Sequence, residues 1–540
     1  MVPVGRTVMT RNGSDLAKEI ESLYRQGLTD YTMEPLVMVD ANQDPVGLIH
    51  DDDAIILCCK RGEREIQLTR SFIDPSFDEF TTRNLNHANF VTLTLYHDMF
   101  LQMPVAVAFP PLQVLDDTLG EVVSQNGLRQ LRVAESEKFA HVTFFLNGNN
   151  NRVFSGEDHI KIPSIKGVPF EQVPELCSGQ VAGEVIKAMQ NDKYAFIVVN
   201  FPNGDMIGHF ENRDPKIKCA EAVDRQLAKV LSAAASAGYV TLITADHGIL
   251  ETAFSPDGTP NLCHTKSPVP FIVVDPDIKH PADTRLKDAG TLADVAPTAL
   301  QIMGLTKPEL MTGQSLLRDR TVPDTARKVL LVVLDGWGLG KRDETNPIFL
   351  ADTPVWDRLI TNFPFTRLQA SGKAVGLIDW KAGNSEAGHQ TIGAGRTVIQ
   401  DDARIELAIK DGSFVKNPVF LSAFEKTIAR DGSLHLIALL SEKSSHGSIR
   451  YPVALLHLAK EKQLKGVFVH AIFDGRSTKV RSAVGFLEKL QKEMNALGLG
   501  ELATGIGRGL ALDRDGDYRK TKKAYDALAF GIGRKVPSGK

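Results

Sequence analysis

Cysteine, excess positive charge and long apolar runs are all scarce in this 540-residue sequence. Its five cysteines are too few for a disulfide framework in a chain of this size, and they fit a reducing compartment. No apolar run approaches the ~18 residues of a membrane-spanning helix, and the first residues lack the apolar core of a secretion signal. The formal net charge of −4 leaves no basic footprint for nucleic acid or an anionic membrane. We therefore expect a soluble cytoplasmic protein without nucleic-acid or membrane partners, in which any anion site is a local basic cluster.

The sequence does contain a regular alternation of apolar runs and helical patterns, which predicts α/β domains with largely parallel sheets. Residues 219–238 repeat apolar side chains at helical spacing and stop at a glycine. Length alone predicts two to four domains, and the polar stretch 312–328 is typical of a surface connection. The runs expected to form strands are AIILCC (54–59), AHVTFFL (140–146), YAFIVVNF (194–201), YVTLITA (239–245), PFIVVD (270–275), KVLLVVLD (328–335), LHLIALLS (434–441) and GVFVHAIFD (466–474).

Residue types that can bind metals stand at the end of one of these runs and directly after another. Asp335 closes the run 328–335, and Asp246 and His247 follow the run 239–245. The carboxyl ends of parallel strands are where α/β enzymes present ligands and catalytic groups. The glycine after His247 permits a sharp turn that could deliver carboxylate and imidazole to one cation. A helix-capping aspartate beside an incidental histidine is the alternative interpretation.

Three further candidates are a pair, Asp205 and His209, and a single residue, His264. Asp205 and His209 stand four residues apart just after the run 194–201. If a helix begins near Asp205, both lie on one face and can share a cation, although such a pair is also typical of a surface helix. His264 precedes the run 270–275, where a lone histidine is usually only polar surface.

Ser385 lies in the glycine-rich turn Gly-Asn-Ser-Glu-Ala-Gly-His. It is either a helix cap or a nucleophile whose hydroxyl is activated by metal coordination. Together the candidates amount to about seven ligands, which suits two cations about 3.5 to 4 Å apart flanking an exposed serine. Such a pair lowers the serine pKa and neutralises phosphate oxygens, as phosphoryl transfer requires. The candidate ligands are Asp205, His209, Asp246, His247, His264, Asp335 and Ser385.

A second group of candidates is basic. A single arginine is more often part of a surface ion pair than of a binding site. Guanidinium groups drawn from several loop segments, however, can hold phosphate and carboxylate in bidentate fashion. The group comprises Arg61, Arg64, Lys138, His446, Arg476, Arg508 and Arg514.

Longer motifs carry a resemblance to a known family. LDGWG, GNSEAGH, LHLIALLS and HAIFDGR, within residues 328–540, are similar to the first half of the family, and GDMIGH, ITADHG, AESEK and MTGQSL, within residues 1–316, to its second half. The chain thus resembles the cofactor-independent phosphoglycerate mutases of the alkaline phosphatase superfamily, in circularly permuted order.

The resemblance implies two α/β domains. One is an alkaline-phosphatase-like, doubly wound metal-binding domain at 113–400, made continuous by a linker at 317–327. The other is a transferase domain that binds substrate, built from 1–112 and 401–540. Closure about hinges near 112 and 400 is expected to exclude water, and a monomer is expected.

The implied activity is interconversion of 3-phosphoglycerate and 2-phosphoglycerate through a phosphoserine at Ser385, without 2,3-bisphosphoglycerate. Two divalent cations are implied. Mn²⁺ is the expected ion, and the ligand types also admit Mg²⁺, Co²⁺ or Zn²⁺. One site matches Asp335, Asp246, His247 and Ser385, and the other matches Asp205, His209 and His264.

The resemblance also assigns roles to the basic group. The implied catalytic residues are Ser385, Lys138, His446 and Arg476. The residues that match substrate-binding positions are Arg61, Arg64, Lys138, His446, Arg476, Ser477, Arg508 and Arg514.

The sequence departs from the family pattern at the substrate end. Ser477 replaces an aspartate thought to handle the proton of the sugar-acid hydroxyl, and Ser448 replaces a second histidine. Two alternatives therefore stay open. The chain could be a phosphoryl or phosphonyl transferase, or a phosphomonoesterase, acting on a related small acid in specialised metabolism. It could also be an inactive binding protein on the same fold.

Overall fold

The computed structural model describes most of the chain, namely residues 14–83, 85, 87–111, 114–255, 257–278, 285–318, 326–442, 444 and 446–538. Most of the expected linker (residues 319–325) and the expected hinge position 112 lie outside these residues. Among the described residues, no helix is long and apolar enough to span a membrane.

The chain forms two compact units. Unit 1 consists of Met1–Pro111 and Arg404–Lys540, and unit 2 of Leu112–Ala403. Each unit is built on its own eight-stranded sheet. The prediction of two α/β domains with largely parallel sheets is confirmed.

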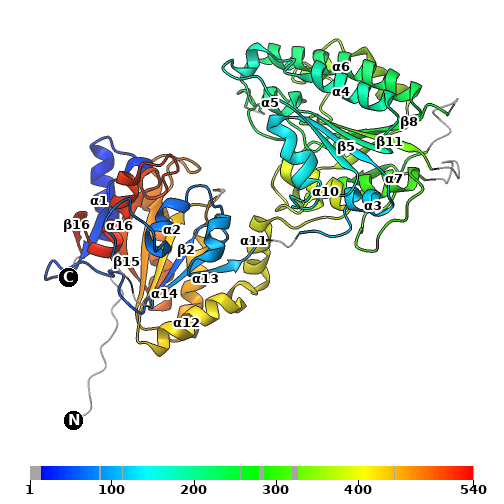
Figure 1. Cartoon of the computed structure of the whole chain (residues 1–540). Coiled ribbons are helices and arrows are strands. Elements are labelled where there is room, and N and C mark those ends of the chain that lie inside the picture. Colours follow the sequence, from blue (N-terminus) through cyan, green and yellow to red (C-terminus); the bar gives the residue numbers. More distant parts are fainter. Residues whose placement is uncertain are drawn as a thin grey trace. The chain divides into compact units, whose positions relative to one another are not determined.

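In the unit 2 sheet seven strands run in the same direction and one strand, β9, runs in the opposite direction. β9 runs antiparallel to both of its neighbours, and all other neighbouring strands run parallel. Helices cover both faces of the sheet (Figure 1), which explains why its inner strands read as continuous apolar runs. The strand order is β10 (Ala289–Thr291), β12 (Phe365–Gln369), β9 (Val269–Val274), β8 (Tyr239–Thr244), β11 (Lys328–Leu334), β7 (Phe196–Phe201), β5 (Gln130–Glu135) and β6 (Glu157–Ile162).

The helices of unit 2 fall on the two faces of this sheet. In Figure 1, α4 and α6 lie on one face, and α3, α7 and α10 lie on the other. Their bounds, with those of the shorter helices, are α3 (Leu119–Gln125), α4 (Ser178–Gln190), α5 (Asn203–Gly208), α6 (Arg213–Ser236), α7 (Val295–Ile302), α8 (Pro347–Leu350), α9 (Pro354–Asn362) and α10 (Ser385–Ala394).

β11 occupies the centre of the unit 2 sheet. It pairs in parallel with β7 and β8, both of which precede it in the chain. In this register Val333 stands opposite Asn200 of β7 and Thr244 of β8. The ends of the three strands are therefore level, and the segments that follow them start from the same edge.

One expected strand is wrong. The run 140–146 forms a helical turn, His141–Phe145, rather than a strand. Its two buried residues, Val142 and Leu146, are four apart, which is the spacing of one helix face. A short apolar run does not distinguish the two structures by itself. The strand in this region is β5, which lies ten residues earlier and contains the fully buried Arg132.

Unit 1 has a sheet of the same size. All its neighbouring strands run parallel except β1 and β15, which are antiparallel. The strand order is β16 (Arg534–Pro537), β1 (Leu36–Val39), β15 (Glu501–Gly507), β14 (Val467–Phe473), β13 (Leu434–Leu440), β2 (Ala54–Cys58), β3 (Asn89–Thr94) and β4 (Val105–Phe109).

The helices of unit 1 come from both ends of the chain. α11 (Asp401–Asp411) carries the chain from unit 2 into unit 1. The others are α1 (Ser14–Arg25), α2 (Ile66–Ile73), α12 (Pro418–Ala429), α13 (Arg450–Glu461), α14 (Ala483–Leu497), α15 (Arg508–Ala511) and α16 (Tyr518–Phe530).

Candidate functional site

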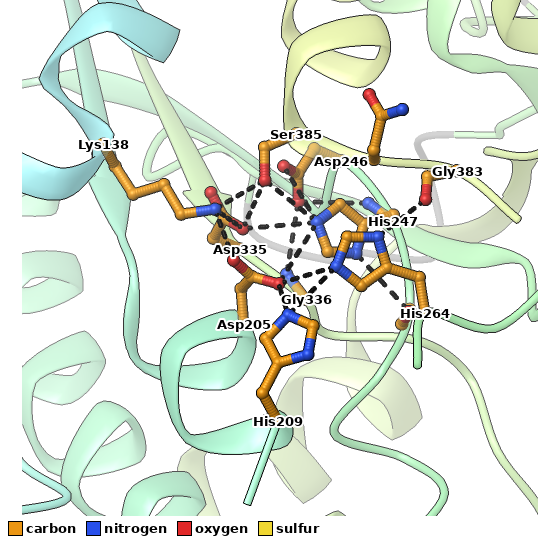
Figure 2. Close-up of polar contacts among 12 residues, drawn as sticks. Lys138, Asp205, His209, Asp246, His247, His264, Asp335, Gly336, Gly383 and Ser385 are labelled. Atoms are coloured by element: carbon orange, nitrogen blue, oxygen red, sulfur yellow. Dashed lines mark hydrogen bonds and ion pairs between the residues drawn. The ribbon is translucent and has the colours of Figure 1, made fainter. Parts of the chain in front are cut away.

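The candidate metal ligands of unit 2 come together at the carboxyl edge of its sheet (Figure 2). Asp335 follows β11 directly, and Asp246 follows β8 after one residue. Asp205 lies in α5, just after β7, and Ser385 is the first residue of α10. Lys138 ends the short turn that follows β5. The position agrees with the general rule that parallel α/β sheets present functional groups at this edge.

Glycines allow the backbone segments to approach so closely. Gly336 has a φ of 77°, and a Cβ on it would lie 2.5 Å from the backbone N of Asp205. That N donates a hydrogen bond to the carbonyl O of Asp335 (2.9 Å), so the turn joins α5 to the end of β11. A Cβ on Gly388 would lie 2.6 Å from the carbonyl O of Asp246, so α10 also packs directly on backbone. Side chains at these positions would move the candidate ligands apart.

The first ligand group consists of Asp205, His209 and His264. The Nε2 atoms of the two histidines lie 3.2 and 3.0 Å from Asp205 Oδ1. Their Nδ1 atoms donate to backbone carbonyls, that of His209 to Leu262 (2.9 Å) and that of His264 to Gly383 (2.8 Å). This arrangement turns both Nε2 atoms toward the carboxylate, the orientation of histidines that share a metal ion with a carboxylate.

The second group surrounds Ser385. His247 Nε2 lies 3.0 Å from Ser385 Oγ and 3.5 Å from Asp335 Oδ1, and Ser385 Oγ donates to Asp335 Oδ1 (3.2 Å). Asp246 Oδ2 lies 3.6 Å from the same His247 nitrogen. Ser385 is only 6 % exposed, so the expectation of an exposed serine is wrong. The ligand side chains and Lys138 enclose its hydroxyl.

The donor set of the second group fits a cation. Asp246 Oδ2 is buried and has no hydrogen-bond donor among the described residues, although Oδ1 accepts from the backbone N of His247 and Gly336. A buried carboxylate oxygen without a donor is costly unless a positive charge faces it. Burial by itself lowers the pKa of His247, but Asp246, Asp335 and Asp205 raise it to about 9. The excess of negative charge therefore favours binding of divalent cations.

Lys138 connects the two ligand groups. Its Nζ lies 2.6 Å from Asp205 Oδ2, 2.9 Å from Asp335 Oδ1 and 2.5 Å from Ser385 Oγ. Burial alone would lower the pKa of Lys138, but Asp335, Asp205 and Asp246 raise it well above its usual value. Lys138 is therefore a fixed positive charge against the serine hydroxyl. Sequence reasoning expected it among both the catalytic and the substrate-binding residues, and the structure adds direct contact with both ligand groups.

Sequence reasoning missed two buried residues that contact the second group. Asn200 Nδ2 donates to Asp335 Oδ2 (2.8 Å), and His389 Nδ1 lies 3.3 Å from Asp246 Oδ2. Two signals in the sequence could have found them. One is the polar Asn200 inside the apolar run of β7, and the other is the histidine four residues after Ser385.

Unit 1 gathers the other candidates at the carboxyl edge of its own sheet. The segments that follow β15, β14, β13 and β2 carry these residues, and the four strands are neighbours. Two contacts join the segments. The backbone N of Lys60 donates to the carbonyl O of His446 (2.7 Å), and Arg64 Nη1 donates to the carbonyl O of Leu512 (3.1 Å). The residues at this edge are Arg61, Arg64, His446, Arg476, Ser477, Arg508 and Arg514.

Carboxylates missed by sequence reasoning pair with these arginines. Glu63 accepts from Arg61 Nη2 (2.6 Å) and from Arg514 Nη1 (2.9 Å). Partial burial alone would raise the pKa of Glu63, but the two arginines lower it. Asp474 accepts from the buried Arg508 Nη1 (2.6 Å). The arginines therefore have carboxylates that can hold them in place around an anion.

His446 also has a structural partner, and so does Ser477, one of the positions where the sequence departs from the family pattern. His446 Nδ1 lies 3.0 Å from Glu65 Oε1, and both side chains are buried. Arg508 Nη1 donates to Ser477 Oγ (3.3 Å), while Arg476 is exposed. Of the motif around His446, residues 443 and 445 lie outside the described part of the chain.

Comparison with protein families identifies the class. A model of the metalloenzyme superfamily matches residues 36–307, about half of the chain, and the chain belongs to this superfamily. A second model, described as the BPG-independent PGAM N-terminus, matches residues 405–539. Superfamily membership and the converging ligand groups together indicate dependence on a divalent metal.

Two curated relatives carry the same name. The chain is 40 % identical over 310 residues to the 2,3-bisphosphoglycerate-independent phosphoglycerate mutase of Synechococcus sp. (strain JA-3-3Ab), covering 57 % of each chain. It is 41 % identical over 322 residues to the protein of that name from Chloroflexus aggregans, covering 55 % of this chain and 58 % of the relative. The alignments thus span little more than half the length of these relatives. A crystal structure of Leishmania mexicana phosphoglycerate mutase at low cobalt concentration is 30 % identical, with a TM-score of 0.39 over 52 % of this chain and 53 % of that one.

Proposed function

We propose that the protein interconverts 3-phosphoglycerate and 2-phosphoglycerate by metal-dependent phosphoryl transfer through a phosphoserine at Ser385. The observation that carries the proposal is the position of Ser385 Oγ, within 3.2 Å of His247 Nε2, Lys138 Nζ and Asp335 Oδ1. The shared name of the relatives supports the substrate.

In the proposed reaction Ser385 Oγ forms a bond to the phosphorus of 3-phosphoglycerate while the bond from phosphorus to the glycerate O3 breaks. The proton that Ser385 Oγ loses is balanced by the one that O3 takes up. The glycerate O2 hydroxyl then attacks the phosphoserine, and the proton it loses is balanced by the one that the departing Oγ takes up. Lys138 stabilises the charge on Oγ and on the transferred group. The family resemblance assigns movement of the hydroxyl proton to His446. The same resemblance assigns binding of the acid's carboxylate to the guanidinium groups of unit 1.

Two divalent cations are part of the proposal. One would be held by Asp335, Asp246, His247 and Ser385, and the other by Asp205, His209 and His264. When bound, they supply a lowered serine pKa and neutralisation of the phosphoryl oxygens. Mn²⁺ is the proposed ion, and no 2,3-bisphosphoglycerate is needed. We also propose a cytoplasmic monomer.

We propose further that the chain order is a circular permutation of the family order. The match to the model described as an N-terminus comes after the metalloenzyme match, and both parallel partners of β11 precede it in the chain. Permutation joins termini at exposed positions at low structural cost. If the sequence is rotated to begin at Lys328, alignment with the relatives should extend from about half to nearly all of their length. An alignment that stays at half contradicts the permutation.

Ser477 favours one alternative. Without a carboxylate at this position, the phosphoserine could pass its phosphoryl group to another small acid or to water. The protein would then be a phosphoryl or phosphonyl transferase, or a phosphomonoesterase, of the same superfamily.

Phosphorus NMR of metal-stripped protein with 3-phosphoglycerate separates these functions. We expect no turnover without metal, and formation of 2-phosphoglycerate without inorganic phosphate after Mn²⁺ is added. Release of inorganic phosphate would favour the phosphomonoesterase, and an unchanged 3-phosphoglycerate signal with Mn²⁺ present would contradict the mutase. Activity that persists at full rate in the stripped protein would contradict the metal requirement.

A further inference from the structure

Two buried residues outside the ligand groups lie against the second group. Asn200 and His389 are both fully buried, the first in β7 and the second in α10. We infer that they form a hydrogen-bonded pair that positions Asp335 and Ser385 for cation binding and phosphoryl transfer. The inference rests on the metal centre of the proposed function and adds two positioning residues to it.

Asn200 holds one oxygen of Asp335. Its Nδ2 donates to Asp335 Oδ2 (2.8 Å) and lies 3.0 Å from His389 Nε2. An amide oxygen at this position would face a carboxylate, so the nitrogen must be the atom that points at Asp335. With Oδ2 held in this way, Asp335 Oδ1 is the oxygen that faces Ser385, Lys138 and His247. Asn200 therefore determines which way the carboxylate is turned.

His389 completes the pair and holds α10. Its Nδ1 lies 2.9 Å from the carbonyl O of Ser385, four residues earlier in the helix. A carbonyl only accepts hydrogen bonds, so Nδ1 carries the hydrogen and Nε2 is left to accept from Asn200. A continuous chain then runs from Asp335 through Asn200 and His389 to the backbone of Ser385.

The pair is distinct from a third cation site. Asp246, Asp335 and His389 have ligand-type atoms within 4.8 Å of one another, as a metal site would. Both ring nitrogens of His389 are already used, however, since Nδ1 donates to Ser385 and Nε2 accepts from Asn200. No lone pair of the ring is free for a cation. We therefore assign His389 to positioning rather than to ligation.

Outer hydrogen-bond partners of metal ligands typically change metal affinity or activity by about 10- to 100-fold when they are removed. Asn200→Asp keeps the size of the side chain but places an oxygen against Asp335. We expect it to weaken one of two Mn²⁺ equivalents by about 10- to 100-fold in calorimetric titration of metal-stripped protein. The equivalent held by Asp205, His209 and His264 should bind as in the parent.

Two variants of His389 give an independent measurement, which also serves if Asn200→Asp fails to fold. His389→Leu removes both hydrogen bonds and should weaken the same Mn²⁺ equivalent. His389→Asn keeps a donor that can reach the Ser385 carbonyl, so it should restore part of the affinity. A merely structural role would not give this partial recovery of metal binding.

Asn147→Asp is the matched control. Asn147 is buried in the same unit, and its Nδ2 donates to the Glu157 carboxylate (3.1 and 3.2 Å), so the same atoms change beside a carboxylate that belongs to no ligand group. It should leave both Mn²⁺ affinities unchanged. Parent-like Mn²⁺ affinity in Asn200→Asp and His389→Leu overturns the inference alone. Three equivalents in the parent and two in His389→Leu also overturn it, because His389 would then be a ligand. A parent that binds no Mn²⁺ overturns both the inference and the proposed metal centre.

Discussion

Ser385→Ala is expected to lower the rate of phosphoryl transfer by on the order of 10⁴-fold or more, because it removes the protein atom that accepts the phosphoryl group from 3-phosphoglycerate in the proposed reaction. The hydroxyl contributes little to packing, so the variant should fold and bind substrate like the parent. The measurement is the rate of 2-phosphoglycerate formation with saturating Mn²⁺, together with the incorporation of labelled phosphate into the protein. Both should be lost, while substrate binding by calorimetry is retained.

Ser178→Ala is the control for this substitution. Ser178 is a buried serine of unit 2 whose hydroxyl donates to the backbone carbonyl of Glu175 (2.8 Å), and it lies in none of the ligand groups. It should retain the parent rate. Turnover of Ser385→Ala within tenfold of the parent contradicts a phosphoserine mechanism. If the parent itself shows no turnover, and Ser385→Ala behaves like the parent in every assay, the result would instead favour a binding protein.

Lys138→Met is expected to cost about 10²- to 10³-fold in the rate of phosphoserine formation, the range observed when one charged or hydrogen-bonding group that stabilises a transition state is removed. The methionine fills a similar volume but leaves Asp205, Asp335 and Ser385 without the ammonium group that all three contact. Lys138→Arg should not restore the rate, since a planar guanidinium cannot occupy the position of a compact ammonium among three acceptors. Rapid-quench measurement of the first turnover isolates this step from product release.

Lys216→Met tests whether loss of any buried lysine has the same effect. Lys216 is fully buried in α6, and its Nζ donates to the carbonyl O of Asn261 (3.0 Å), away from Ser385. It should change the stability of unit 2 but leave the first-turnover rate near that of the parent. Equal losses in the two variants would contradict a specific role for Lys138.

The fold was largely predictable because the inner strands are buried on both faces and read as apolar runs. Seven of the eight expected strands are present. The run 140–146 failed because Val142 and Leu146 fit one helix face as well as a strand. β5 was missed because its buried Arg132 interrupts the apolar pattern, and that charge is balanced by Glu157, which is distant in sequence.

Most of the candidate ligands could be proposed from the sequence because they follow a strand or stand in a motif with fixed spacing, whereas His264 is a lone loop histidine that gained its proposed role only from the family resemblance. The outer partners of the ligands could not be proposed in this way. Asn200 and His389 act through contacts with Asp335 and Ser385 that only the folded sheet brings about. The burial of Ser385 was missed for the same reason, since the side chains that enclose it come from separate segments.

Transfer through Ser385 can be observed directly by mass spectrometry of the protein after acid quenching of a single turnover with 3-phosphoglycerate and Mn²⁺. We predict one phosphate on the peptide that contains Ser385 at early times, followed by its loss as 2-phosphoglycerate forms. Formation of 2-phosphoglycerate with no phosphate on that peptide at any time, or a phosphate on a different residue, would contradict transfer through Ser385.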